Sequence, residues 1–210
     1  MPLTLDSCMT VKEVIELYED TDGDDEFNGD VVLRIAEIVS AGDEELSDSL
    51  EYRDLMIQAS LYCDTLLVEI TEALSALEEA YSAEEWDQMT DSLYADWESD
   101  EAMSDAAAEV DDVNVLLREF KGFLHDIGES VAGLYGSDFD FGWDSNMNEA
   151  FFGDFWGTEM NMDKISQAHA QMAHLMEKVT QLGIRFDNNM DEADRYIQQR
   201  VDEEWAKCTG

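Results

Sequence analysis

Apolar residues recur at alternating steps of three and four along most of the chain, the spacing that gathers them on one face of an α-helix. Four such seams follow one another, and we expect each to pack against other helices. Their members are Ala59, Cys63, Leu66, Ile70, Ala73, Leu77 and Ala80; Val110, Val113, Leu117, Phe120, Leu124, Ile127, Val131 and Leu134; Ile165, Ala168, Met172, Leu175, Val179 and Leu182; and Phe186, Met190, Ala193, Ile197, Val201 and Trp205. Since no alternating apolar–polar run of useful length occurs, the sequence predicts an all-α fold.

The N-terminal part predicts two shorter helices. Thr10 and Glu13 match a capping box, and the apolar pattern behind them ends near Glu19. A second apolar pattern covers residues 31–41, and Gly42 then favours a helix stop.

Residues 20–30, between these two patterns, are rich in Asp and Gly and predict an acidic loop. The loop begins like a calcium-binding EF-hand, but Asp25 stands where the sharp turn needs Gly and Val31 where a bidentate Glu is needed. We therefore favour a plain acidic loop, with weak divalent-cation binding as the open alternative.

Three features predict helix boundaries further along. Ser82 with Glu85 forms a second capping-box pattern and indicates a turn or a fresh helix start. Thr158 is a candidate cap for the helix that follows, and Gly183 interrupts the apolar seam on that helix.

A segment of different character, residues 136–157, carries glycines, aspartates and a heavy aromatic load. It predicts a connection that closes one end of the helical core, or alternatively an exposed aromatic anchor beside an acidic face. Its aromatic residues are Phe139, Phe141, Trp143, Phe151, Phe152, Phe155 and Trp156.

The length suits one domain, or at most two small ones. We expect residues 1–210 to form a helical bundle of five to seven helices with a long aromatic-rich connection. A finer division separates acidic N-terminal helices and loop (1–45), long helices that carry an acid-only stretch (46–135), the aromatic connection (136–157) and C-terminal helices (158–210).

Charge dominates the composition, with 52 Asp and Glu against 11 Lys and Arg and a formal net charge of −41. Leu, Ile, Val and Phe together number 49 of 210 residues, just above the roughly 20% below which highly charged chains stay unfolded. The sequence therefore predicts a folded protein. The charge argues against direct binding to nucleic acid or to an anionic membrane, because both need a basic face.

Three features of the sequence bear on the cellular compartment. Cys8, Cys63 and Cys208 are odd in number and far apart, which indicates a reducing interior rather than a disulfide framework. The chain starts without a basic and apolar leader, and no run approaches 18 apolar residues. We expect a cytoplasmic protein.

The distribution of charge is more informative than the total. Residues 54–117, which we call the acidic stretch, contain 18 carboxylates and no Lys or Arg. Folded as two antiparallel helices, they would carry one carboxylate per ~2.7 Å of axis, against one charge per about 1.7 Å in duplex DNA.

Three interpretations of an acid-only face compete. The face imitates a phosphate backbone and meets Arg and Lys of a partner; or the acidity is an adaptation to high salt; or the face is merely solvated. Five Lys, six Arg, eleven Met and the uneven distribution argue against salt adaptation, and −41 exceeds what solubility needs.

The acidic stretch in a small helical protein resembles the DNA-mimic proteins of phages and mobile elements, which block restriction, CRISPR or other DNA-binding host proteins. The resemblance lies in composition and charge pattern over about a third of the chain. It implies an inhibitor that occupies the cationic groove of a nucleic-acid-binding host protein, in the host cytoplasm if phage-encoded. A homodimer is also compatible with the pattern.

The candidate partner-binding residues are acids of this stretch. They are Glu78, Glu79, Glu84, Glu85, Asp87, Asp91, Asp96, Glu98, Asp100 and Glu101. The runner-up function is an acidic immunity protein or chaperone that holds a basic toxin or a histone-like partner.

Tests for catalytic and metal-binding motifs are negative. His125, His169 and His174 lack a Glu three residues before them, so the di-iron signature is missing, and no phosphate-binding loop or nucleophile motif occurs. We predict no catalytic residue, no metal and no cofactor.

Overall fold

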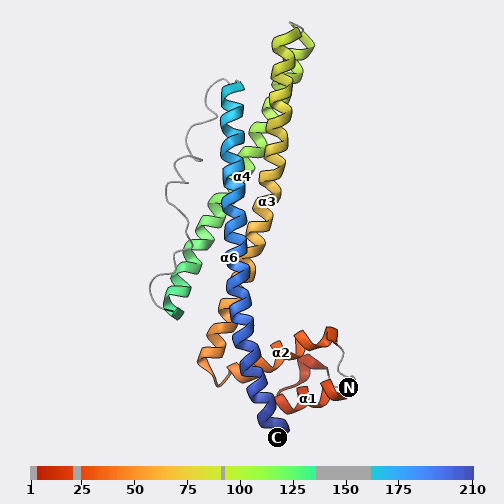
Figure 1. Ribbon diagram of the computed structural model, residues 1–210, viewed down its shortest axis with the longest axis vertical. Helices are drawn as coiled ribbons and strands as arrows, with labels where there is room; N and C mark the ends of the chain where they lie inside the picture. Colours follow the sequence, from red (N-terminus) through yellow and green to blue (C-terminus); the bar gives the residue numbers. More distant parts are fainter. Residues whose placement is uncertain (1–3, 21–24, 91–92, 136–161) are drawn as a thin grey trace. The chain divides into compact units, whose positions relative to one another are not determined.

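The structure is a computed structural model that describes residues 4–20, 25–90, 93–135 and 162–210 (Figure 1). Within these ranges, the side chains of 25–28, 86–90, 93–99 and 129–135 lie outside the description. The elements are a short 3₁₀ helix η1 (Leu5–Ser7) and the α-helices α1 (Val11–Asp20), α2 (Asp25–Ser40), α3 (Glu44–Thr90), α4 (Leu93–Tyr135) and α6 (Met162–Thr209).

The all-α prediction is confirmed, since the described ranges hold five α-helices and no strand. The count falls within the predicted five to seven. The predicted aromatic connection, residues 136–157, lies outside the described residues, as does the candidate cap Thr158.

The predicted seams are the buried faces of the three long helices. On α3 all seven members from Ala59 to Ala80 are buried, and on α4 the described members from Val110 to Ile127 are buried. On α6 all six members of the third seam are buried, as are Phe186, Ala193, Ile197 and Val201 of the fourth seam, whereas Met190 and Trp205 are half-buried. Each helix therefore forms because one continuous apolar stripe is removed from water, which stabilises a long helix more than propensity does.

The N-terminal capping box is also confirmed. The backbone N–H of Thr10 donates to Glu13 Oε2 at 3.1 Å, and the N–H of Glu13 donates to Thr10 Oγ1 at 3.3 Å. Helix α1 ends at Asp20, next to the predicted end at Glu19. Gly42 follows the end of α2, and its N–H donates to the carbonyl of Val39 at 3.0 Å.

The structure corrects the predicted boundaries at Ser82 and Gly183, because α3 and α6 run through them without a break. The Ser82 hydroxyl donates to the carbonyl of Glu78 at 2.9 Å, a bond within the helix rather than a cap. A Cβ at Gly183 would lie 3.6 Å from the Cβ of Cys63, so the glycine marks a close approach of α6 to α3.

The predicted acidic loop over 20–30 is also corrected in part. Helix α2 begins at Asp25, so the second half of the segment is helical. Asp20, where the EF-hand-like pattern begins, is the last residue of α1, and residues 21–24 lie outside the described residues.

The chain divides into two compact units, and α3 and α6 each contribute residues to both. Unit 1 comprises residues 1–58 and 186–210, and unit 2 comprises residues 59–185. The prediction of one domain stays a prediction.

Unit 1 has its own apolar core, which joins η1, α1, α2 and the nearby parts of α3 and α6. Its fully buried members include Val14, Ile35, Leu46 and Ile197. Arg34 on α2 ties the N-terminal turn to this core, because its guanidinium donates to the carbonyl of Cys8 at 2.7 Å.

The described part of unit 2 consists of residues 59–90 of α3, the whole of α4 and residues 162–185 of α6. Helix α4 returns alongside α3 (Figure 1), and their contact is shown by the ring of Tyr62, whose centroid lies 5.6 Å from that of Phe120 and 4.9 Å from that of Phe123. Unit 2 thus holds most of the acidic stretch on two paired helices.

Candidate acidic binding face

The acidic residues of α3 lie beside its buried seam and on its outer side. Glu72 and Glu79 are one heptad apart and both are exposed. On α4 acids recur at intervals of seven residues, at Asp105, Asp112, Glu119 and Asp126, and all four are exposed. Because seven residues are nearly two helical turns, each set shares one side of its helix.

The structure describes the side chains of six of the ten predicted binding residues. Glu78, Glu79, Glu85, Asp100 and Glu101 are exposed, and Glu84 is half-buried. Asp91 is outside the described residues, and so are the side chains of Asp87, Asp96 and Glu98.

Of these six residues, Glu78 has a defined partner across helices. Its Oε1 lies 3.4 Å from Nε2 of His169 on α6, a residue 91 positions away. The pair is an ion pair only when His169 carries a proton. Glu78 therefore lies at the junction of α3 and α6 rather than on an isolated outer surface.

Three carboxylates that sequence reasoning did not select lie close together between α3 and α4. One oxygen from each of Glu69, Glu72 and Glu109 lies within 4.8 Å of the others, and we call this set the carboxylate cluster. A sequence signal exists for it, since Glu69 and Glu109 each directly precede a seam residue, Ile70 and Val110. Pairing the two seams antiparallel brings equivalent flanking positions together.

The acidic stretch contains no Lys or Arg that could relieve the electrostatic repulsion within the carboxylate cluster. The pKa of Glu69 is raised, first because the carboxylate is partly removed from water and then because Glu72, Asp112 and Glu109 are like charges. A carboxylate with a raised pKa costs free energy to keep ionised. The cluster is therefore a place where an arriving positive charge would be stabilised.

The cluster could in principle hold a divalent cation, because carboxylate oxygens are hard ligands. It offers three carboxylates that are exposed or half-buried, whereas a calcium ion takes six to eight oxygens. The geometry supports cation attraction more than a dedicated metal site.

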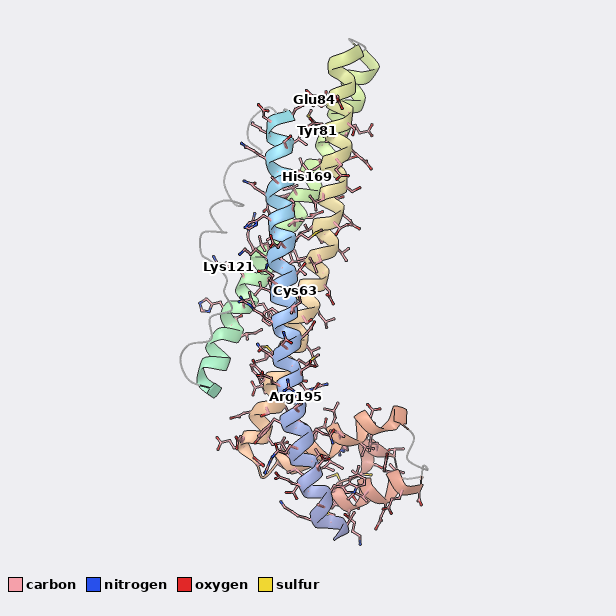
Figure 2. The ribbon with its side chains drawn as sticks, in the orientation of Figure 1. Cys63, Tyr81, Glu84, Lys121, His169 and Arg195 are labelled. Atoms are coloured by element: carbon pink, nitrogen blue, oxygen red, sulfur yellow. The ribbon has the colours of Figure 1, made fainter. Side chains whose placement is uncertain are left out.

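A cavity of about 420 Å³ lies beside Glu78, between α3 and α6 of unit 2. We call it the Glu78 cavity. Figure 2 labels two of the residues that line it, Tyr81 on α3 and His169 on α6, which lie at neighbouring levels of the two helices.

None of the described helices carries an apolar run long enough to cross a membrane. Comparison of the chain with protein-family models, with curated proteins and with solved structures finds no match.

Proposed function

We propose that the acidic face of α3 and α4 in unit 2 binds a strongly cationic partner, and that the chain acts as an inhibitor that mimics DNA. The observation that supports this most is the acidic stretch itself. Its 64 residues contain no Lys or Arg, and those that the structure describes (54–90 and 93–117) lie on two paired helices and include the carboxylate cluster.

The physical reason is that the carboxylates of the unbound acidic face repel one another, and a cationic partner would remove that repulsion. Like charges at Glu69, Glu72 and Glu109 raise the free energy of the unbound protein. A groove lined with Arg and Lys would replace that repulsion with charge-assisted hydrogen bonds. Association would be fast and would weaken steeply as salt is added.

The most specific form of the proposal is an inhibitor that occupies the nucleic-acid groove of a host defence protein, such as a restriction or CRISPR component. A rod of paired helices with outward carboxylates approaches the linear charge density that such a groove accepts. An immunity protein or chaperone for a basic toxin or histone-like partner shares the same electrostatics, and the competition experiment below separates the two.

The first experiment identifies a partner by its salt dependence and then tests competition. Proteins captured from host lysate at low salt are eluted with rising salt, and the DNA binding of a purified captured protein is measured with and without this chain. The proposal expects mutual exclusion between this chain and DNA. A partner that binds both at once, without loss of affinity for either, contradicts mimicry.

A matched pair of variants then tests the face. Neutralising Glu69, Glu72, Glu109 and Asp112 (each Glu→Gln, Asp→Asn) should weaken partner binding by about tenfold or more, since each exposed pair contributes up to about 1 kcal/mol. The control removes the same charge from exposed acids of unit 1, at Glu19, Glu51, Asp191 and Glu192. Equal losses from both variants would show that net charge, not this face, is what binds.

A further inference from the structure

The Glu78 cavity has an apolar floor and a polar rim. Leu77 on α3 and Ile165 on α6 line its inner side and are 0% and 1% exposed. Its volume of about 420 Å³ lies at the small end of ligand pockets, which are roughly 300–1,000 Å³. The space therefore suits one side chain or a small molecule rather than a segment of a partner protein.

The rim brings together one carboxylate, two rings and two hydroxyl groups. Glu78 supplies the carboxylate, with its side chain 73% exposed, and His169 lies 3.4 Å from it. Tyr81 is 39% exposed. Ser82 and Ser166 complete the rim from the two helices.

This combination of groups fits a flat cation. The carboxylate can accept two parallel N–H bonds from a guanidinium, and a tyrosine ring can stack on its face. The Ser82 hydroxyl already donates its hydrogen to the carbonyl of Glu78, so the lone pairs of its oxygen remain to accept. A compact ammonium group would use the charge of Glu78 but neither the stacking nor the forked geometry.

The charge of the residues around the cavity disfavours an anionic ligand. Glu78 and Tyr81 lie in the acidic stretch, and the described residues that line the cavity include no Lys or Arg. A phosphate or carboxylate ligand would meet the Glu78 carboxylate with no lining Lys or Arg to compensate the repulsion, which costs free energy.

We propose that the Glu78 cavity accepts an arginine side chain of the cationic partner, and so gives the acidic face a preference for arginine over lysine. This inference rests on the proposed function, because it names the group of the partner that one position of the face recognises. It differs from general electrostatic attraction, which depends on charge alone.

The test uses two fluorescein-labelled peptides, nona-arginine and nona-lysine, with binding to the full-length chain measured by fluorescence anisotropy at low salt. Glu78→Gln is compared with Glu79→Gln, because the two substitutions remove equal charge from adjacent residues and Glu79 does not line the cavity. We expect Glu78→Gln to weaken nona-arginine binding about tenfold and nona-lysine binding about twofold. Glu79→Gln should weaken both about twofold.

A second variant fills the cavity without changing charge. Ser166→Trp should weaken nona-arginine binding about fivefold and leave nona-lysine binding unchanged, provided that its melting temperature and circular dichroism match the wild type. If that variant fails to fold, Tyr81→Leu removes the ring while keeping apolar bulk, and it should show the same selectivity.

The outcomes distinguish the two proposals. If the wild type binds both peptides with steep salt dependence but no variant affects arginine selectively, the arginine site is wrong and the acidic face stands. If the wild type binds neither peptide at low salt, the proposed function fails and the arginine site fails with it. A larger loss for nona-arginine with Glu78→Gln, together with selectivity in Ser166→Trp or Tyr81→Leu, supports the site.

Discussion

Unit 1 and unit 2 are both acidic, but they differ in where their Lys and Arg residues lie relative to their carboxylates. Unit 1 has 24 carboxylates and six Lys or Arg in 83 residues, and unit 2 has 28 and five in 127. Unit 1 is therefore the denser in acids. What sets unit 2 apart is that its cations lie outside the acidic stretch, so the parts of α3 and α4 that belong to the stretch carry one sign of charge.

In unit 1, cations join helices that are distant in sequence. Arg53 Nε on α3 lies 2.5 Å from Asp194 Oδ1 on α6. Arg200 on α6 pairs with Asp43, which precedes α3. Asp43 also caps that helix, because its Oδ1 accepts from the N–H of Leu46 at 3.2 Å.

The pKa values of two carboxylates, Asp43 in unit 1 and Glu69 in unit 2, shift in opposite directions. The hydrogen bond from Arg200, and then that from the Leu46 amide, holds the pKa of Asp43 below its ordinary value. Burial and like charges hold the pKa of Glu69 above its ordinary value. Ionised carboxylates thus stabilise unit 1 at Asp43 and destabilise unit 2 at Glu69, and the comparison shows that pairing matters more than the number of acids.

The largest expected effects come from the cores, where both units should respond alike. Leu66→Ala in unit 2 and Ile35→Ala in unit 1 each remove a fully buried side chain. We expect each to cost about 2–5 kcal/mol of unfolding free energy. Amide hydrogen exchange should show the loss of protection in the substituted unit; an equal loss in both units for both variants would show that the units unfold as one.

Added salt should have the next largest effect. Screening shortens the reach of repulsion to about 8 Å at physiological ionic strength, so the melting temperature should rise between low and high sodium chloride while partner binding weakens. The variant that neutralises Glu69, Glu72, Glu109 and Asp112 should gain less from salt than the matched unit 1 variant. A melting temperature that is independent of salt would contradict the repulsion among carboxylates that we infer for the unbound protein.

Removing the unit 1 ion pair should change the acid sensitivity of that unit. Because the folded-state pKa of Asp43 is lowered, its contribution is present above the ordinary Asp pKa and is lost as pH falls through the lowered value. Arg200→Met should lower the melting temperature at neutral pH and flatten its decline in acid. Lys207→Met, which removes an exposed pair with Glu204, is the control and should leave the profile unchanged.

The smallest effect is expected from Glu69→Gln and has the opposite sign. Because the folded-state pKa of Glu69 is raised, its penalty is full at neutral pH and disappears as pH falls through the raised value to the ordinary Glu pKa. The substitution should stabilise the protein at neutral pH by less than about 1 kcal/mol, since partly solvated charges are screened. Glu51→Gln in unit 1 should have no such effect, and a destabilised Glu69→Gln would show that the cluster is not repulsive.

The buried faces of the long helices could be predicted from the sequence alone. Leu66, Val113 and Leu175 are buried where the heptad spacing places them, and the Thr10–Glu13 cap has the predicted bonds. Both are short-range consequences of helical periodicity and backbone hydrogen bonding.

The helix boundary predicted at Ser82 was wrong because a local capping pattern competed with a longer apolar seam. A serine followed by Glu85 can cap a helix, but the seam that contains Leu77 and Ala80 stays buried up to this point. Burial of that seam stabilises the continuous helix, and the Ser82 hydroxyl bonds back to the helix instead. Gly183 was misread for a related reason, since its missing side chain admits a neighbouring helix.

The sequence by itself determined the helical fold, the seams and the absence of cations over residues 54–117, because each depends on residue type and spacing along one chain. Only the tertiary structure decided which acids meet. The carboxylate cluster needs the register between α3 and α4, and the Glu78–His169 contact joins residues 91 positions apart. Helical periodicity defines the sides of a helix, but the packing of one helix on another decides which sides face each other.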